Sequence, residues 1–218
     1  MNGRPEELER FLTWFARQPH QRKLFIAGNH DLTLDEASYP TTHTRFGHPP
    51  EWRETIASCR RLIERAAAEG VEYLHDSGTS VDGVTFWGSP YQPEFCDWAF
   101  NLPRGEACRQ VGPTQPAIND NHKGGGEGSE VWRKVPVGTD VVISHGPALG
   151  HGDLCFSGVR AGCLDLLFEI QTRVVPQYLV CGHIHEGYGV TSDGSTTFVN
   201  ASSCNLRYRP DNKPLVFD

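Results

Sequence analysis

Three short apolar segments of this chain each run into a loop that carries histidine, and this coincidence constrains the fold more than any other feature. The segments with their loops are Phe25–Asp31, Val142–Pro147 and Val180–Glu186. Each begins as a continuous apolar run, which is typical of a strand buried on both faces. Layered α/β folds build their sites where the carboxyl ends of such strands meet. The pattern therefore predicts one site that draws side chains from three distant parts of the chain.

The remaining sequence predicts mixed α and β structure in which strands dominate. The spacing of apolar residues indicates helices near residues 5–18, 52–69 and 161–175. Short apolar runs indicate strands at residues 23–27, 71–74, 140–144 and 178–181, and Asp-Gly pairs at residues 82–83 and 193–194 indicate two hairpins. A last apolar run, Pro214–Phe217, is expected to pair as a closing strand. Residues 112–138 contain three consecutive glycines and are expected to form a long surface loop.

Length and composition limit the classes of function. The chain has 218 residues, 38% of them hydrophobic, and is expected to form a single domain over residues 1–218. Its net charge of −7 argues against a nucleic-acid-binding surface. Without a long apolar stretch or a secretory signal, we expect a cytoplasmic protein with no membrane contact. The seven cysteines contain no C-x-x-C pair, so we expect free thiols. The sequence assigns no oligomeric state.

The strand-end loops carry imidazole and amide groups, which suit manganese, zinc or iron better than calcium. Taken alone, His145 is more often a satisfied structural residue than a metal ligand, and the turn-forming Asn29 and Asp31 could simply make a loop. His183 and His185 share one side of an extended strand, which favours a joint role as ligands. Together the loops favour a metal site. The histidines elsewhere are expected to be solvated: His20, His43, His48, His75, His122 and His151.

A glycine precedes or follows the polar residues in each loop. Gly28, Gly146 and Gly182 are expected to let the backbone turn sharply and to approach an ion or a phosphate closely, because glycine has no Cβ.

These motifs resemble three signature blocks of the calcineurin-like metallophosphoesterases, and within them the brain-type metallophosphoesterase domain-containing proteins and their fungal relatives. The blocks are Gly28–Asp31, Ser144–Gly146 and Gly182–His185, supported by Trp87–Pro93, Phe100–Gly105 and Phe198–Ser202. The resemblance implies an α/β (α+β) fold with a two-sheet β-sandwich flanked by helices in four layers. It also implies two divalent metal ions at the sheet ends.

The resemblance further implies a role for each matching residue. Asn29, His145 and His183 would bind one ion, and His185 would bind the other. His30 and Asn29 would be catalytic, with His30 contacting the phosphate and protonating the leaving oxygen. Two further residues are expected to act through these side chains. Asp31 is expected to orient His30, and Glu186 is expected to lie next to the metal ligands without binding an ion itself. Arg104 is a candidate for binding the substrate phosphate, with a structural salt bridge as its alternative.

Two blocks of the resembled family have no counterpart in this sequence. No Asp-x-His and no Gly-Asp block precedes Asn29, so one ion keeps three of its expected ligands and the other keeps one. We therefore expect an N-terminally incomplete domain that lacks about one βαβ unit, roughly 30 residues. A misplaced start codon and a decayed gene would each account for it. Activity is expected to be weak or absent, because neutral ligands hold a second divalent ion poorly.

Three functions remain open from the sequence. The first is a metal-dependent phosphoesterase that hydrolyses a phosphomonoester or phosphodiester of a small molecule, such as a nucleotide, with a metal-activated water. The second is a non-catalytic metal- or phosphate-binding remnant that acts by interaction. The third, a structural β-sandwich with incidental histidines, requires three histidine loops to arise by coincidence and ranks last.

Overall fold

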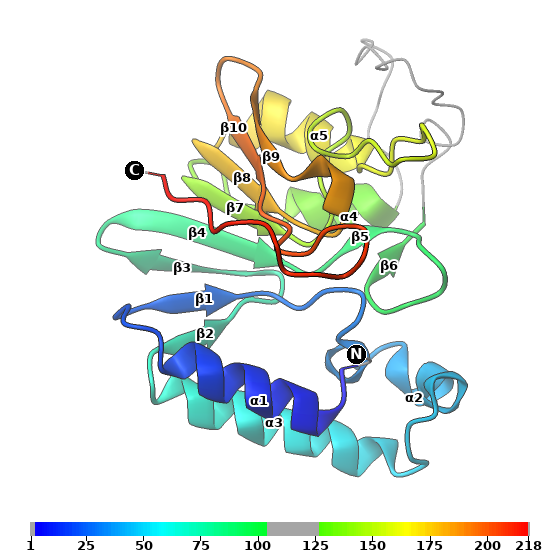
Figure 1. The fold of residues 1–218 in the computed structure, drawn as a ribbon. Coiled ribbons are helices and arrows are strands. Elements are labelled where there is room, and N and C mark those ends of the chain that lie inside the picture. The colour runs from blue at the N-terminus through cyan, green and yellow to red at the C-terminus, as the bar shows by residue number, and fades with distance from the viewer. Residues whose placement is uncertain (1–2, 104–126, 218) are drawn as a thin grey trace.

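A computed structural model of the chain describes residues 3–103 and 127–217. The helices are α1 (Pro5–Ala16), α2 (Tyr39–Thr42), α3 (Trp52–Ala67), α4 (Glu127–Arg133) and α5 (Leu164–Glu169), which continues as a π-helical turn at Ile170–Val174. The strands are β1 (Lys23–Phe25), β2 (Val71–Tyr73), β3 (Ser77–Val81), β4 (Val84–Ser89), β5 (Gln92–Pro93), β6 (Asn101–Leu102), β7 (Val141–Ser144), β8 (Tyr178–Cys181), β9 (Gly189–Ser192) and β10 (Thr197–Asn200). Sheets flanked by helices confirm the expected mixed α/β class (Figure 1).

The main sheet has six strands in the order β3-β4-β7-β8-β10-β9. The inner strands β4, β7, β8 and β10 are parallel, and antiparallel β3 and β9 close the two edges. The predicted hairpin turn at Asp82 and Gly83 is confirmed, because both residues have the positive φ angles (52° and 87°) of a two-residue turn. Helices α4 and α5 pack with this sheet around a core that includes Trp132, Leu166 and Phe198.

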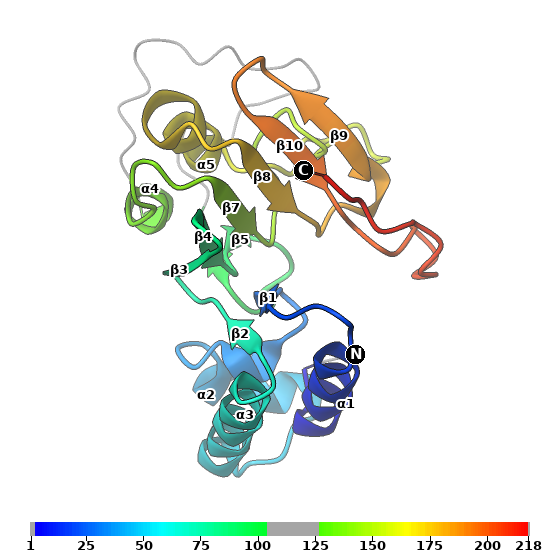
Figure 2. The same ribbon diagram turned by 90° about the vertical axis from the view of Figure 1, so that its left-hand side faces the viewer.

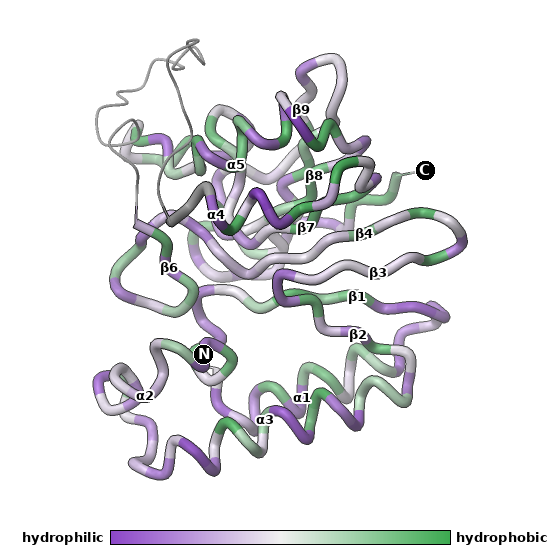
Figure 3. Tube along the Cα trace, turned by 180° about the vertical axis from the view of Figure 1, so that it is seen from behind, coloured by the Kyte–Doolittle hydropathy of each residue, from purple (hydrophilic) through white to green (hydrophobic). Residues whose placement is uncertain are grey.

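A second sheet consists of the parallel strands β1 and β2, which lie beside helices α1 and α3 (Figure 2). Apolar and polar residues alternate along both helices (Figure 3), and Leu8, Leu12 and Leu62 point into a second core. Gly70 ends the α3 segment with φ +76°, and an added Cβ there would come within 2.7 Å of the Gln21 carbonyl oxygen. Only glycine fits this connection to β2.

The two cores meet at Tyr91, which packs against both. Next to this contact, Gly88 of β4 lies so close to Leu74 that an added Cβ would be 2.3 Å from the Leu74 Cβ. The loops that follow β1, β7 and β8 reach the same junction, which places chemistry-bearing residues of both halves beside each other.

The structure differs from the sequence-based expectation in two segments. Residues 104–126, which include most of the predicted loop and Arg104, lie outside the described residues. The rest of that predicted loop contains α4, because Val131 and Trp132 have a core in which to bury. The closing strand predicted at Pro214–Phe217 is wrong: the segment is irregular, since Pro214 has no N–H for a sheet ladder and the Phe217 ring instead stacks on Tyr178 at 4.3 Å.

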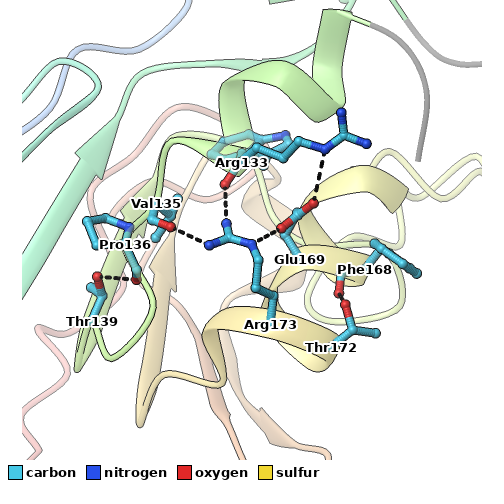
Figure 4. Close-up of polar contacts among 9 residues, drawn as sticks. Arg133, Val135, Pro136, Thr139, Phe168, Glu169, Thr172 and Arg173 are labelled. Atoms are coloured by element: carbon cyan, nitrogen blue, oxygen red, sulfur yellow. Dashed lines mark hydrogen bonds and ion pairs between the residues drawn. The ribbon is translucent and has the colours of Figure 1, made fainter. Parts of the chain in front are cut away.

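A buried carboxylate joins α4 to α5 (Figure 4). Glu169, whose side chain is 6% exposed, pairs with Arg173, and Arg133 lies 3.8 Å from its other oxygen. The Arg173 guanidinium also donates to the carbonyl oxygens of Val135 (2.7 Å) and Trp132 (3.0 Å). One arginine thus satisfies acceptors on both helices.

Replacement of Arg173 by methionine is expected to lower the free energy of unfolding by about 2 kcal/mol, because it leaves a buried carboxylate and two carbonyls short of donors while keeping the apolar stem. Urea denaturation measures the change. The matched control is Arg22→Met, which breaks the exposed pair with Glu72 and should cost under about 1 kcal/mol. Equal losses in the two variants would contradict the role assigned to Arg173.

In the described ranges, no helix combines the length and the apolar character that crossing a bilayer requires.

Candidate functional site

The three strand-end loops converge on one cavity of about 390 Å³, as the sequence pattern predicted. The loop after β1 contributes two polar side chains, the loop after β7 one and the loop after β8 three, and most of the other lining residues lie in residues 202–208. These six side chains belong to Asn29, His30, His145, His183, His185 and Glu186.

Asn29 and His145 come from different sheets and are in direct contact. The Asn29 side chain is buried, and its Oδ1 accepts a hydrogen bond of 2.8 Å from Nε2–H of His145. Since Asn29 belongs to the β1 loop and His145 to the β7 loop, this bond joins the two halves of the molecule. It also brings an amide oxygen and an imidazole nitrogen to within the spacing of neighbouring ligands on one ion.

The histidines of the cavity are electrostatic neighbours. The imidazole rings of His145 and His183 have their centroids 4.8 Å apart. Burial above all, and then the nearby imidazoles of His183, His30 and His185, hold the pKa of His145 well below its usual value. His145 is therefore neutral at neutral pH, which is the protonation state that ligates a metal.

His183 has an unusual backbone conformation for a residue with a Cβ. Its φ angle is +67°, in the left-handed region that favours glycine. The amide of the preceding residue, Gly182, donates to the His145 carbonyl oxygen at 3.0 Å and so fixes this loop to the neighbouring one. Strained conformations of this kind collect at functional sites, where surrounding contacts hold them in place.

His185 and Glu186 are each held by one neighbouring segment. Nδ1–H of His185 donates to the Asn205 carbonyl oxygen at 3.1 Å, which leaves Nε2 as the nitrogen with a free lone pair. Glu186 Oε1 accepts the backbone N–H of Phe156 at 2.9 Å. This carboxylate therefore joins the loop after β8 to the loop that contains Phe156.

His30 and Asp31 leave the β1 loop in different directions. The half-buried His30 ring lines the cavity and lies 4.3 Å from the Trp98 ring. Asp31 Oδ2 accepts the backbone N–H of Gly28 at 2.7 Å and thereby closes the loop. Burial raises the Asp31 pKa to about 6, with a smaller contribution from the Glu7 charge, while the Gly28 hydrogen bond opposes the rise.

The glycines of the three loops differ in why they are needed. None of the three has a positive φ, so a sharp turn is not the reason. A Cβ on Gly28 would lie 2.5 Å from the His145 ring, and a Cβ on Gly146 would lie 2.8 Å from Gln92. At Gly182 the nearest atom would be Ser202 Oγ at 3.7 Å, an ordinary contact. Close approach is thus required at Gly28 and Gly146 alone.

Several residues of the cavity carried no signal in the sequence. Its wall also includes the apolar residues Phe95, Leu206 and Tyr208 and the free thiols of Cys155 and Cys204. These residues lie in irregular segments, where no periodicity marks them. Two of the histidines expected to be solvated, His43 and His48, are buried, because they pack around Tyr39; His122 lies outside the described residues.

Among the described residues, the cavity offers three donor groups for one divalent ion and one imidazole, without a bridging carboxylate, for a second. In the part of the chain that the structure describes, no three His, Cys, Asp or Glu side chains are placed to hold an ion together. A ligand set for one ion therefore needs the Asn29 amide beside His145 and His183, and none of these three groups is a carboxylate. Because Glu186 is the one carboxylate among the described lining residues and is bonded to a backbone amide, no group there is placed to bridge two ions.

Known proteins resemble this chain in fold and in sequence. A solved structure with 16% sequence identity has a TM-score of 0.57 against this chain and covers 91% of it and 63% of that structure, which shows the fold alone. No protein-family model matches the chain. Two curated mammalian proteins are each 38% identical to it over 218 residues, and a nematode protein is 32% identical over 222 residues.

Over 99% of its length the chain resembles proteins named for a metallophosphoesterase domain, which agrees with the resemblance of its strand-end motifs. The mammalian relatives are the Metallophosphoesterase domain-containing protein 1 of Homo sapiens and of Mus musculus, and the nematode relative is a UPF0046 protein of Caenorhabditis elegans. The matches cover 99% of this chain, 60% of the mammalian relatives and 51% of the nematode one. The chain therefore spans about 60% of the length of its mammalian relatives.

Proposed function

We propose that the histidine cavity is the site of a metal-dependent phosphoesterase, which hydrolyses a phosphomonoester or a phosphodiester of a small molecule. The observation that carries the proposal is the convergence of six nitrogen- and oxygen-bearing side chains, from three strand ends, on one cavity. The similarity to metallophosphoesterase domain-containing proteins supports the same reaction class.

In this proposal Asn29, His145 and His183 hold one divalent ion, and His185 offers its free Nε2 to a second. Manganese, zinc and iron suit such imidazole and amide donors. A bound ion supplies positive charge that offsets the phosphate and polarises its P–O bonds. The second ion is held weakly, because no carboxylate among the described residues is placed to share it with the first.

His30 contacts the phosphate and transfers a proton to the leaving oxygen. The His30 ring lines the cavity and contacts the Trp98 ring, and this contact restricts the rotation of the imidazole. A positioned imidazole acts well as a general acid near neutral pH. Asp31 fixes the loop that presents His30 by binding the Gly28 amide.

The second candidate function is a non-catalytic protein that binds a metal or a phosphate and acts by interaction. The observation in its favour is the donor set, which lacks a bridging carboxylate among the described residues. Such a site still binds an ion. It lacks the pair of closely spaced ions that stabilises the negative charge of the reacting phosphate in two-metal hydrolysis.

Hydrolysis of bis(para-nitrophenyl) phosphate in the presence of manganese distinguishes the two functions. For the phosphoesterase we expect nitrophenol release that falls by about 100-fold in His30→Gln, while manganese binding measured by calorimetry stays unchanged. His20→Gln is the matched control, because His20 is exposed and does not line the cavity. A His30 variant as active as the wild type contradicts the role of His30, and a manganese-loaded wild type without turnover supports the non-catalytic function.

A further inference from the structure

The mouth of the histidine cavity is apolar, although exposed surface around a site for a phosphate would be expected to be polar or basic. Phe95 is 48% exposed, Leu206 55% and Tyr208 72%, and all three line the cavity. Large apolar side chains gathered around one opening are typical of a binding surface rather than of ordinary protein surface. Binding of a phosphate group alone does not require these apolar side chains.

Two of these side chains are rings that adjoin the histidines. The Phe95 ring centroid is 5.2 Å from that of His183 with the planes at 87°, and the Tyr208 ring centroid is 5.3 Å from that of His185 with the planes at 84°. Each ring therefore stands nearly perpendicular to an imidazole, and the two rings come from separate loops. An ester group extending from a phosphate at the histidines meets aromatic carbon directly.

Both loops that carry the rings are braced by polar contacts. The Phe95 amide donates to Asn101 Oδ1 at 3.2 Å. Asn205 Oδ1 accepts the amides of Arg207 (2.8 Å) and Arg209 (3.2 Å), which shapes the turn that presents Tyr208. Rings held in place before a ligand arrives lose little freedom on binding it.

The charge of the wall is consistent with a ligand of low charge. None of the described residues that line the cavity is a lysine or an arginine, and Glu186 adds a carboxylate to it. A substrate with several phosphates would need more positive charge than a wall without lysine or arginine provides.

We infer that the cavity selects phosphoesters with an aromatic ester group, whose ring packs against Phe95 and Tyr208 while the phosphate lies at the histidines. The inference rests on the proposed function for the position of the phosphate. It assigns Phe95 and Tyr208 as residues that determine specificity, and it names the substrate class as low-charge aryl phosphoesters.

Binding of two non-reporting ligands tests this selectivity without requiring turnover. Diphenyl phosphate and dimethyl phosphate carry the same single charge, and each is titrated into the full chain with manganese present. We expect diphenyl phosphate to bind about tenfold more tightly, since each of its rings can pack against an aromatic side chain. The preference should fall to within about twofold in the double variant Phe95→Ser, Tyr208→Asn.

The variants are chosen so that folding is preserved. Both rings are exposed, and asparagine accepts the positive φ of 55° at Tyr208 better than most residues. Trp14→Ser is the matched control, because Trp14 is a 58% exposed ring on α1 outside the cavity wall and its loss should leave the preference intact.

Equal affinity of the wild type for the two phosphates, or no binding of either, overturns the inference, as does a preference that survives in the double variant. Turnover of bis(para-nitrophenyl) phosphate is scored separately. An aromatic preference without turnover keeps the inference and refutes the phosphoesterase, whereas turnover without the preference does the reverse.

Discussion

Replacement of Gly28 by alanine is expected to weaken the proposed metal binding and the proposed phosphoester hydrolysis together. The added Cβ would lie 2.5 Å from Cε1 and 2.6 Å from Nδ1 of His145, distances that no carbon contact tolerates. Because the His145 ring must move, its Nε2 leaves the Asn29 oxygen that it now contacts at 2.8 Å. Misplacement of His145 by about 1 Å is expected to lower kcat/KM by roughly 100-fold. Weaker binding of the ion should lower it by about another tenfold, which gives a total loss of about 1,000-fold.

Gly182→Ala is the matched control for this prediction. Gly182 belongs to the equivalent strand-end loop after β8, yet its added Cβ would meet its nearest atom at 3.7 Å, and its φ is not positive. Calorimetry with manganese and the nitrophenol assay should therefore give near wild-type values for Gly182→Ala. If the two alanine variants behave alike, or if Gly28→Ala still binds manganese normally, the tight packing of His145 over Gly28 is not what builds the site.

Much of the site could be predicted because strand ends and loop chemistry are local features of the sequence. The apolar runs before Asn29, His145 and His183 mark buried parallel strands, and parallel strands end at one edge of a sheet. Since β7 and β8 are parallel neighbours in the main sheet, that geometry places His145 beside His183 and His185 in one cavity. The contact of Asn29 with His145, across 116 residues of sequence, joins two different sheets, so this rule alone does not give it.

The features that could not be predicted depend on tertiary contacts. The α4 helix lies in a segment that reads as loop, because its amphipathic run is short and its stability comes from the core that buries Trp132. Phe95 and Tyr208 lie in irregular loops, where no period relates them to the histidines. His43 and His48 lie among polar residues in the sequence and are buried only because Tyr39 lies between them in space.

Replacement of Trp132 by alanine is expected to cause the largest loss of stability, about 4 kcal/mol in the free energy of unfolding. Trp132 is fully buried in the core between α4, α5 and the main sheet, so its removal leaves a cavity that the surrounding helices cannot fill. For a chain of this length, that loss corresponds to a fall in Tm of about 8–16 °C. Urea denaturation and thermal unfolding followed by circular dichroism measure both quantities.

Trp132→Phe separates lost volume from lost polarity. Nε1 of Trp132 is buried and has no hydrogen-bond partner among the described residues, so phenylalanine keeps most of the apolar contact and removes an unsatisfied donor. We expect this variant to lose under about 2 kcal/mol, and Trp14→Ala, at an exposed position, to change stability by less than about 0.5 kcal/mol. A Trp132→Ala variant as stable as Trp14→Ala would mean that α4 contributes nothing to the core. Since α4 and α5 pack against the sheet that presents His145 and His183, the Trp132→Ala variant should also lose manganese binding at temperatures where the wild type keeps it.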